Sequence, residues 1–186
     1  YASTWGAGKA FKIDAVTGAV SDFTAEGVIS TASASRGIDT DRDGNVYICH
    51  RSLNKVSVYS PAGDAQPQTY GQSAVSSVFV DDDDNKIYLN STTSLRVYEK
   101  GTSQYSDFGT QTGFATIAKV KTGSAIEDIL VLGNWAGSIS TLPTAPLPAE
   151  SPVEKFSGVG SIQHIDVEPI DACPAGLAPS VEKSCF

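Results

Sequence analysis

The sequence has no methionine, only two histidines and two tryptophans, and three cysteines among its 186 residues. It contains no apolar run near the ~20 residues that a transmembrane helix needs, so membrane insertion is not expected. Its 13 Lys and Arg are dispersed and are outnumbered by 21 Asp and Glu, which gives a net charge of −8. Because binding to phosphates requires a concentrated basic surface, a nucleic-acid partner is not expected either.

The few cysteines divide into a pair and a single residue. Cys173 and Cys185 bracket an irregular tail that contains proline and glycine, and this predicts a disulfide between them. Cys49 lies inside an apolar strand and is expected to be a buried free thiol.

The missing initiator methionine has two explanations. A secretion signal removed before Tyr1 is one, and excision from a longer chain is the other. We expect a secreted, extracellular protein. In a secreted eukaryotic protein, Asn90 of the tripeptide 90–92 would be a glycan acceptor.

The residues that are abundant favour an all-β fold. The 17 glycines and 9 prolines are spread along the chain, and serine, threonine and valine are frequent. This composition is typical of many short strands joined by turns. The length fits one domain that can bury a sizeable core.

The chain repeats itself four times. Residues 37–60 and 78–99 share one order: an apolar strand, an acidic turn, a second strand, a polar turn and a third strand. Residues 1–18 match the segment that starts at Tyr47, and 129–141 is a more diverged copy. We take four residues as equivalent: Tyr1, Tyr47, Tyr88 and Leu130. Their spacing of roughly 41 to 46 residues is the length of a four-stranded propeller blade.

The innermost strand of each blade is expected at 36–40, 77–81, 115–120 and 163–168. The copy at Tyr1 has no innermost strand, whereas 163–168 has no second or third strand after it. Pairing of this C-terminal strand with the N-terminal blade would leave no open sheet edge. The sequence therefore predicts a propeller of four blades, each with four antiparallel strands, closed within 1–170 and followed by a tail at 171–186. Four consecutive blades of a larger ring are the alternative.

The outermost strands each place an aromatic residue shortly before a small one. We interpret these aromatic residues as one repeated position that packs between blades: Phe23, Tyr70, Phe108 and Phe156.

Residues 37–63 resemble an NHL-type propeller repeat. In that repeat a Gly-Ile/Val-Ala-Val-Asp strand leads through Asp-Gly-Asn to Val-Tyr-Val, then to Asn-x-Arg-Ile-x-Val-Phe and Pro-x-Gly. The matching residues are Gly37, Ile38, Asp39, Asp43, Gly44, Asn45, Val46, Tyr47, Asn54, Lys55, Val56, Val58, Tyr59, Pro61 and Gly63. His50 stands where the family usually has Asp, and the full ring usually has six blades. The resemblance implies a β-propeller, a fold that serves binding platforms, scaffolds and enzymes alike.

The acidic turns raise the question of a metal site. Asp39, Asp41 and Asp43 are spaced like the first ligands of an EF-hand loop, but position 12 is His50 instead of a bidentate Glu. Asp-Gly-Asn followed by a β-rich segment favours a tight hairpin turn, with bound Ca²⁺ as the alternative. The same hairpin in the next copy carries Asp82 and Asp84, to which both interpretations also apply.

Catalytic motifs are weak. A metal-dependent hydrolase of the lactonase or gluconolactonase propeller kind would hold a cation at the channel through Glu, Asn and Asp residues. The candidates for that role are Glu168, Asn134, Asn90 and Asp82. Only His50 and His164 are available for zinc, whereas a catalytic zinc site normally has three protein ligands.

We therefore expect a non-enzymatic extracellular propeller that acts as a binding or assembly module, with the hydrolase as the alternative. Trp5 and Trp135 are candidate contacts for a protein or glycan partner, and packing on the blade is the competing interpretation. The tail at 171–186 is the candidate segment for self-assembly. A subunit of a long repeat protein or filament is a third hypothesis.

Overall fold

The computed structural model describes residues 1–3, 10–23, 35–91, 94–107, 114–120, 129–134, 136–143, 153–158 and 162. Within these ranges the chain is almost entirely strands and turns, with one short 3₁₀ segment, η1 (Arg51–Leu53). No helix in the described part of the chain has the length and apolar character needed to cross a membrane.

The strands form four antiparallel sheets, which we call blade 1 to blade 4. Blade 1 has three strands: β1 (Ala2–Ser3), β2 (Ala10–Ile13) and β3 (Val20–Asp22). Blade 2 consists of β4 (Ser35–Thr40), β5 (Val46–His50), β6 (Lys55–Tyr59) and β7 (Ala65–Gly71). Blade 3 consists of β8 (Val75–Asp81), β9 (Lys86–Ser91), β10 (Leu95–Glu99) and β11 (Tyr105–Asp107). Blade 4 consists of β12 (Phe114–Val120), β13 (Ile129–Asn134), β14 (Ile139–Pro143) and β15 (Val153–Phe156).

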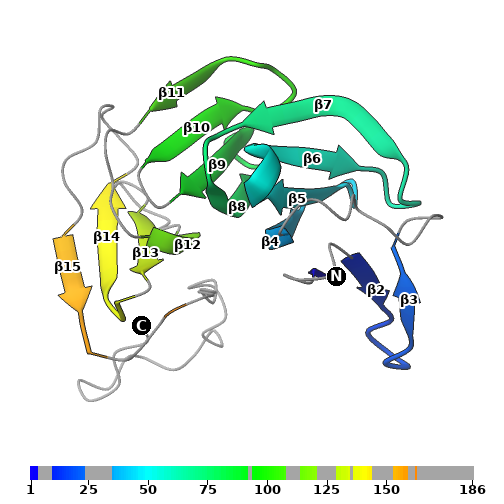
Figure 1. The fold of residues 1–186 in the computed structure, drawn as a ribbon, viewed down its shortest axis with the longest axis horizontal. Coiled ribbons are helices and arrows are strands. Elements are labelled where there is room, and N and C mark those ends of the chain that lie inside the picture. The colour runs from blue at the N-terminus through cyan, green and yellow to red at the C-terminus, as the bar shows by residue number, and fades with distance from the viewer. Residues whose placement is uncertain are drawn as a thin grey trace, which may run out of the picture.

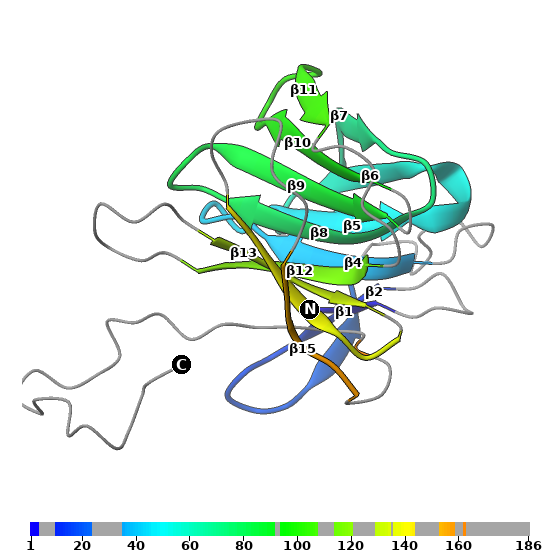
Figure 2. The ribbon, with the colours of Figure 1, turned by 90° about the vertical axis from the view of Figure 1, so that its left-hand side faces the viewer.

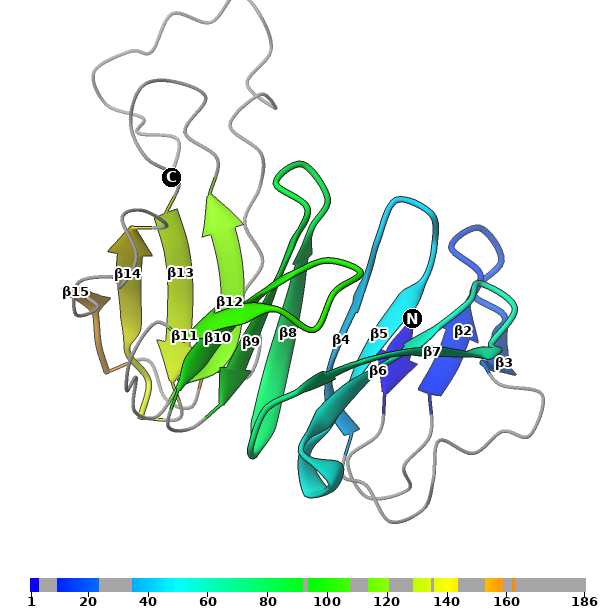
Figure 3. The ribbon, with the colours of Figure 1, turned by 90° about the horizontal axis from the view of Figure 1, so that it is seen from above.

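Each sheet is a meander whose strands pair in chain order, so the four predicted repeats are confirmed as four sheets. The strands β4, β8 and β12 are the inner strands, and β4 and β12 both contact β8. Figure 3 shows the blades side by side in chain order, with blades 1 and 4 at the two ends. The outer strands β7 and β11 lie away from the inner strands, at the top of Figure 2.

The blades are held together by three apolar clusters, one at each junction. Because both faces of a middle blade are buried, its strands are apolar on both sides, as in the buried run of β5. Blades 1 and 2 meet through Ala10, Phe23, Val46 and Ile48, with Ile38 and Tyr59 packed against them. Blades 2 and 3 meet through Tyr47, Cys49, Val56, Val58, Tyr70, Val75, Val78, Val80, Ile87, Leu89 and Tyr98. Blades 3 and 4 meet through Tyr88, Leu95, Val97, Ile117, Leu130, Leu132 and Leu142, with Phe79 alongside.

The predicted role of the outer-strand aromatic residues is confirmed where they are described. The Phe23 ring packs edge-on against Tyr59 of the next blade, with ring centroids 6.0 Å apart. The Tyr70 ring packs edge-on against Tyr98 of the next blade at 5.1 Å. Phe108 and the side chain of Phe156 lie outside the described residues.

The equivalence assigned to Leu130 is wrong by one residue. Tyr47 and Tyr88 lie in the clusters that join their blades to the following blade. Leu130 lies in the same cluster as Tyr88, so it faces the preceding blade. Since neighbouring residues of a strand point to opposite faces, the true counterpart of Tyr88 is Val131.

Closure of the ring remains a prediction. Blade 1 lacks an inner strand among the described residues, as expected, because β1 is at the edge of its sheet. The segment 163–168 that should complete it lies outside the described residues, as do the tail 171–186 and the pair Cys173 and Cys185. Figure 1 shows the four blades as an arc, with β3 of blade 1 and β15 of blade 4 at its two ends.

The inner strands of blades 2 and 3 approach each other closely at Gly37. A Cβ atom on Gly37 would lie 2.7 Å from Cα of Ser77 and 3.0 Å from the carbonyl oxygen of Ser76. Backbone atoms cannot move aside as a flexible side chain can, so only glycine fits this position.

Gly37→Ala should therefore lower the free energy of unfolding by about 1–3 kcal/mol, through overpacking at the junction of blades 2 and 3. Urea denaturation followed by tyrosine and tryptophan fluorescence measures this change. Gly71→Ala is the matched control, since its added Cβ would have the Tyr98 hydroxyl at 3.9 Å as its nearest neighbour. Equal stability of the two variants would contradict the close approach.

Candidate functional site

The turn between β4 and β5 is a tight hairpin organised by Asp41. The Asp41 Oδ1 atom accepts a hydrogen bond from the Asn45 amide at 2.8 Å. The Oδ2 atom accepts hydrogen bonds from Asn45 Nδ2 at 2.9 Å and from the Tyr47 hydroxyl at 3.1 Å. Gly44 has a φ of +80°, the positive angle that the Asp-Gly-Asn sequence was expected to supply. The carboxylate of Asp41 thus stabilises its own turn.

Asp39 joins blade 2 to blade 3. Its Oδ2 atom accepts a hydrogen bond from the Val80 amide of β8 at 2.7 Å, and Oδ1 accepts one from the Thr40 amide at 2.8 Å. A charged acceptor for a backbone donor makes a stronger hydrogen bond than a neutral one. The carboxylate therefore ties the inner strand β4 to the inner strand β8.

The second acidic turn, between β8 and β9, is neutralised by lysines. The Lys119 ammonium, on β12 of blade 4, binds both Asp81 and Asp84 of blade 3. The side chains of Lys119 and Asp81 are 1% and 3% exposed, so this ion pair is nearly removed from water. A buried charge is tolerated when it is paired in this way.

Lys100 makes a second bridge between blades on the same side. Its ammonium binds Asp82 of its own blade and lies 3.1 Å from Asp41 Oδ2 of blade 2. Asp82 also accepts a hydrogen bond from the Arg42 amide of blade 2 at 2.7 Å. Consequently the turns of blades 2 and 3 form one network of carboxylates and cations, which we call the acidic-turn network.

The network shifts the pKa of its members in opposite directions. Burial acts to raise the pKa of Asp41, but hydrogen bonds from Asn45 and the Lys100 ammonium outweigh it, and the pKa lies below its ordinary value. Burial acts to lower the pKa of Lys100, but its bonds to Asp82 and Asp41 outweigh it, and the pKa is raised. Both shifts favour the charged forms and therefore the ion pair.

Bound Ca²⁺ on these turns stays a prediction that the described geometry does not favour. Lysine ammonium groups occupy the place where a cation would neutralise Asp41, Asp81, Asp82 and Asp84. Within the described ranges, no three His, Cys, Asp or Glu side chains group so as to hold a metal. Of the two remaining candidate ligands, Asp39 accepts hydrogen bonds from the Val80 and Thr40 amides, and Asp43 is exposed on the turn.

Asp41→Ala should lower the free energy of unfolding by about 2–3 kcal/mol, because it removes the turn hydrogen bonds and one partner of the partly buried Lys100. Chemical denaturation at pH 7 measures the change. Asp43→Ala, in the same turn but exposed, is the control and should change stability by less than about 0.5 kcal/mol. A similar cost for both variants would contradict the structural role of Asp41.

The opposite ends of the blades carry His50 and Asn90, near the ends of β5 and β9. Asn90 is 0% exposed, and among the described residues neither its Oδ1 nor its Nδ2 atom has a hydrogen-bond partner. The prediction that Asn90 carries a glycan does not fit this burial, because a glycan requires an accessible amide nitrogen. Trp5 and Trp135, also expected at this end, lie outside the described residues.

His50 is 2% exposed. Burial first, and the Lys55 charge second, lower the pKa of His50 from 6.5 to about 4. Cys49 beside it is a buried free thiol, as predicted, and burial raises its pKa.

The His50 pKa predicts loss of stability in mild acid. The unfolded chain binds a proton near pH 6.5, whereas the folded chain resists it until about pH 4, so stability falls as the pH drops through this window. Unfolding free energies measured from pH 7 to pH 5, above most carboxyl pKa values, should decline for the wild type and decline less for His50→Gln. Parallel profiles would show that His50 does not carry the effect.

Two arginines at this end were not identified from the sequence. Ser35 pairs with His50 across β4 and β5, and the register then shifts before the next pair, Ile38 with Ile48, so Arg36 lies in a β-bulge. Arg51 directly follows His50. A bulge re-aims side chains, but it leaves no pattern in a single strand sequence, so nothing marked Arg36 in advance.

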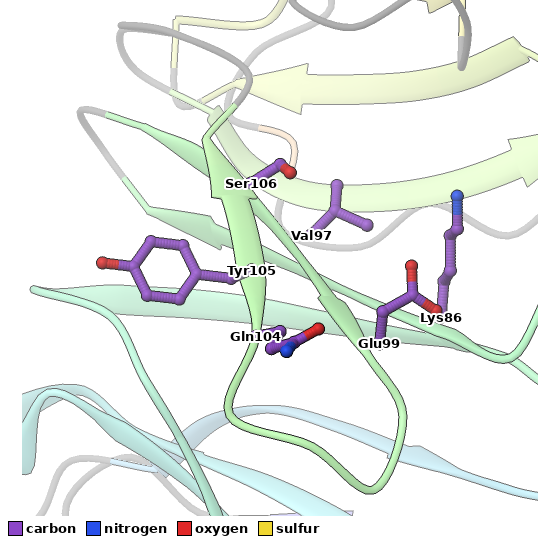
Figure 4. A pocket seen from close by; sticks show the side chains of 6 residues that line it. All are labelled: Lys86, Val97, Glu99, Gln104, Tyr105 and Ser106. Carbon is purple, nitrogen blue, oxygen red and sulfur yellow. The ribbon is translucent and has the colours of Figure 1, made fainter.

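Figure 4 shows a shallow pocket of about 240 Å³ on blade 3, lined by Lys86, Val97, Glu99, Gln104, Tyr105 and Ser106. Lys86 and Glu99 are cross-strand partners of opposite charge. The Tyr105 ring points away from both in the figure, and it lies under the Arg96 guanidinium, 3.9 Å from ring centroid to Cζ. The pocket is thus lined mainly by polar side chains.

Solved structures with similar folds include two lyases and a third protein. Virginiamycin B lyase from Staphylococcus aureus is similar with a TM-score of 0.56 and 16% identity over 80% of this chain and 48% of its own. A streptogramin B lyase has a TM-score of 0.57 and 13% identity over 81% and 48%. A protein from Lactobacillus plantarum has a TM-score of 0.51 and 13% identity over 82% and 52%. The chain spans about half the length of each.

These similarities show the fold alone, because the identities are low. The chain has an all-β, propeller-like fold. No family model and no curated protein matches it, so the resemblance to NHL repeats stays a prediction.

Proposed function

We propose that this chain is a non-enzymatic propeller module that binds or assembles with a partner through its ends and turns. The observation that supports this most is the acidic-turn network. Its carboxylates and lysines bind one another across blade junctions, which is a structural use of charge. Groups held in this way are poor candidates for acid-base chemistry, because their charged forms are already stabilised by fixed partners.

Exposed apolar residues at the two ends of the arc support assembly. On blade 1, Ile13 is 45% exposed and Val20 is 63% exposed, and the two are cross-strand partners on β2 and β3. On blade 4, Val153 of β15 is 52% exposed. At the junctions, apolar residues of the same sheets are buried against the next blade. Apolar residues left at an edge are typical of surfaces that contact another protein.

The location and partner follow from the sequence alone. We propose an extracellular protein, with Trp5, Trp135 and the tail 171–186 as further contacts for a protein or glycan. A tail disulfide between Cys173 and Cys185 would fix the shape of that contact.

The alternative, a metal-dependent hydrolase, requires its candidate ligands to converge. Asp82 precedes β9, whereas Asn90 is near the end of this strand. At about 3.3 Å per residue, the length of β9 separates them by well over 10 Å, so they cannot share one cation. The similar lyase structures support a propeller frame and leave the chemistry of this chain open.

Self-association and turnover test the proposal. In sedimentation velocity, the whole chain should associate as its concentration rises, and Ile13→Asp should weaken association because it places a charge on the apolar end of blade 1. Val16→Asp is the control: Val16 is 94% exposed on the adjacent turn. If the wild-type chain and both variants stay monomeric at all concentrations, assembly through this end is contradicted. If metal analysis finds a stoichiometric cation and the chain also turns over a lactone or a phosphotriester, the proposed non-enzymatic function is contradicted.

A further inference from the structure

The face of blade 1 that is turned away from blade 2 is apolar, and we call it the free face of blade 1. Ala10 of β2 lies in the cluster between blades 1 and 2, and neighbouring residues of a strand point to opposite faces. Phe11 and Ile13 therefore lie on the free face, and Val20 joins them as the cross-strand partner of Ile13. Ile13 and Val20 are 45% and 63% exposed, so this apolar face is open to solvent.

The repeat shows what a face of this kind packs against. Ile13 corresponds to Tyr59 of blade 2 when residues 1–18 are aligned with the segment that starts at Tyr47. Tyr59 packs edge-on against Phe23 of the preceding blade, with ring centroids 6.0 Å apart. Ile13 thus stands at the position through which blade 2 packs on the outer strand of the blade before it.

Blade 4 has the complementary free face, turned away from blade 3. Val131 is the counterpart of Tyr88, which lies in the cluster that joins blade 3 to the following blade. Val131 pairs with Thr141, and Thr141 pairs with Val153, so the three residues lie on one face of the sheet. Val153 is 52% exposed. Blade 4 therefore presents the same kind of face that blades 2 and 3 bury against their successors.

The two free faces do not meet each other within the described part of the chain. There, blade 1 contacts blade 2 and blade 4 contacts blade 3, whereas no substantial contact joins a strand of blade 1 to a strand of blade 4. Figure 1 shows the reason: the blades form an arc, with β3 and β15 at its two ends. Each of the three junctions consists of one face of each kind, so the free faces of blades 1 and 4 complement each other.

We propose that two copies of this chain form one ring, in which the free face of blade 4 of each copy packs against the free face of blade 1 of the other. Two copies of four blades each would give eight, within the roughly four to eight blades that propellers have. The alignment with 48% of each similar lyase chain supports an arc that is part of a larger structure. The two-copy ring rests on the proposed assembly function and gives it a partner, a second copy of the chain.

The proposed contact is head-to-tail, because it joins two different surfaces. A ring of two copies contains this contact twice, and the ring ends association at the pair. A dimer that uses the same surface on both copies, such as blade 1 on blade 1, would contain one symmetric contact and would leave blade 4 free. The two arrangements therefore respond differently to a change on blade 4.

Sedimentation velocity of the whole chain measures the association. The wild type should form a pair and no larger species. Ile13→Asp and Val153→Asp should each weaken pairing roughly tenfold or more, because each places a charge in an apolar contact. Val16→Asp is the matched control and should pair within about twofold of the wild type, since Val16 is 94% exposed on the turn between β2 and β3.

An equal mixture of the Ile13→Asp and Val153→Asp chains tests the head-to-tail arrangement. In a mixed pair, the unchanged blade 4 of the first variant meets the unchanged blade 1 of the second, so one whole contact is restored. The mixture should therefore pair roughly tenfold or more tightly than either variant alone, with one variant fluorescently labelled to detect the mixed pair. A symmetric dimer through blade 1 would gain nothing from mixing.

Four results would overturn the two-copy ring. They are a wild type that is monomeric at all concentrations, species that grow beyond a pair, a mixture no tighter than its components, and Val153→Asp pairing like the wild type. The last result, with Ile13→Asp still weakened, would leave the proposed assembly through blade 1 intact. Turnover of a lactone by a chain with a stoichiometric cation would instead contradict the proposed non-enzymatic function. Circular dichroism and thermal melting check that each variant is folded, as expected for substitutions at exposed positions.

Discussion

The packing of each inner strand against the next one is the constraint on which the rest of this structure depends. Gly37 allows the backbones of blades 2 and 3 to come close, and Asp39 then reaches the Val80 amide across the same junction. With the inner strands at this spacing, the apolar faces of the two sheets pack against each other from the centre out to Tyr70 and Tyr98. Polar contacts thus set the register at the centre, while apolar area supplies most of the stabilisation.

The acidic turns show how charge can stabilise the packing of one sheet against the next. Isolated carboxylates in a hairpin would repel one another, and exposed ion pairs contribute little. Here Lys119 of blade 4 pairs with Asp81 of blade 3, and both side chains are nearly withdrawn from solvent. Such pairs favour the packing of one particular blade against the next, because a blade without the matching lysine would leave a buried carboxylate uncompensated.

Much of the fold could be predicted because repetition multiplies a weak signal. The place of a single strand such as β9 within its sheet cannot be predicted from that strand alone. Because the same order of strands and turns recurs, the positions of the inner and outer strands could be predicted. The packing positions of Phe23 and Tyr70 could be predicted in the same way. The error at Leu130 arose where the copy is most diverged, because an apolar run without alternation does not reveal which face each residue takes. The lysine partners of the turns were missed because they are distant in sequence, one on the turn after β10 and one on the strand β12. The bulge at Arg36 was missed for a related reason, since it exists only in the pairing of two strands.

Two lysine bridges cross the blade boundaries in one direction, with the acid on the earlier blade and the base on the later one: Asp41 to Lys100, and Asp81 to Lys119. The two lysines come from different places in their repeats, a turn in one case and an inner strand in the other. The repeats are therefore no longer interchangeable modules. A duplicated or swapped blade would separate acid from base, so these pairs fix the order in which the blades can stand.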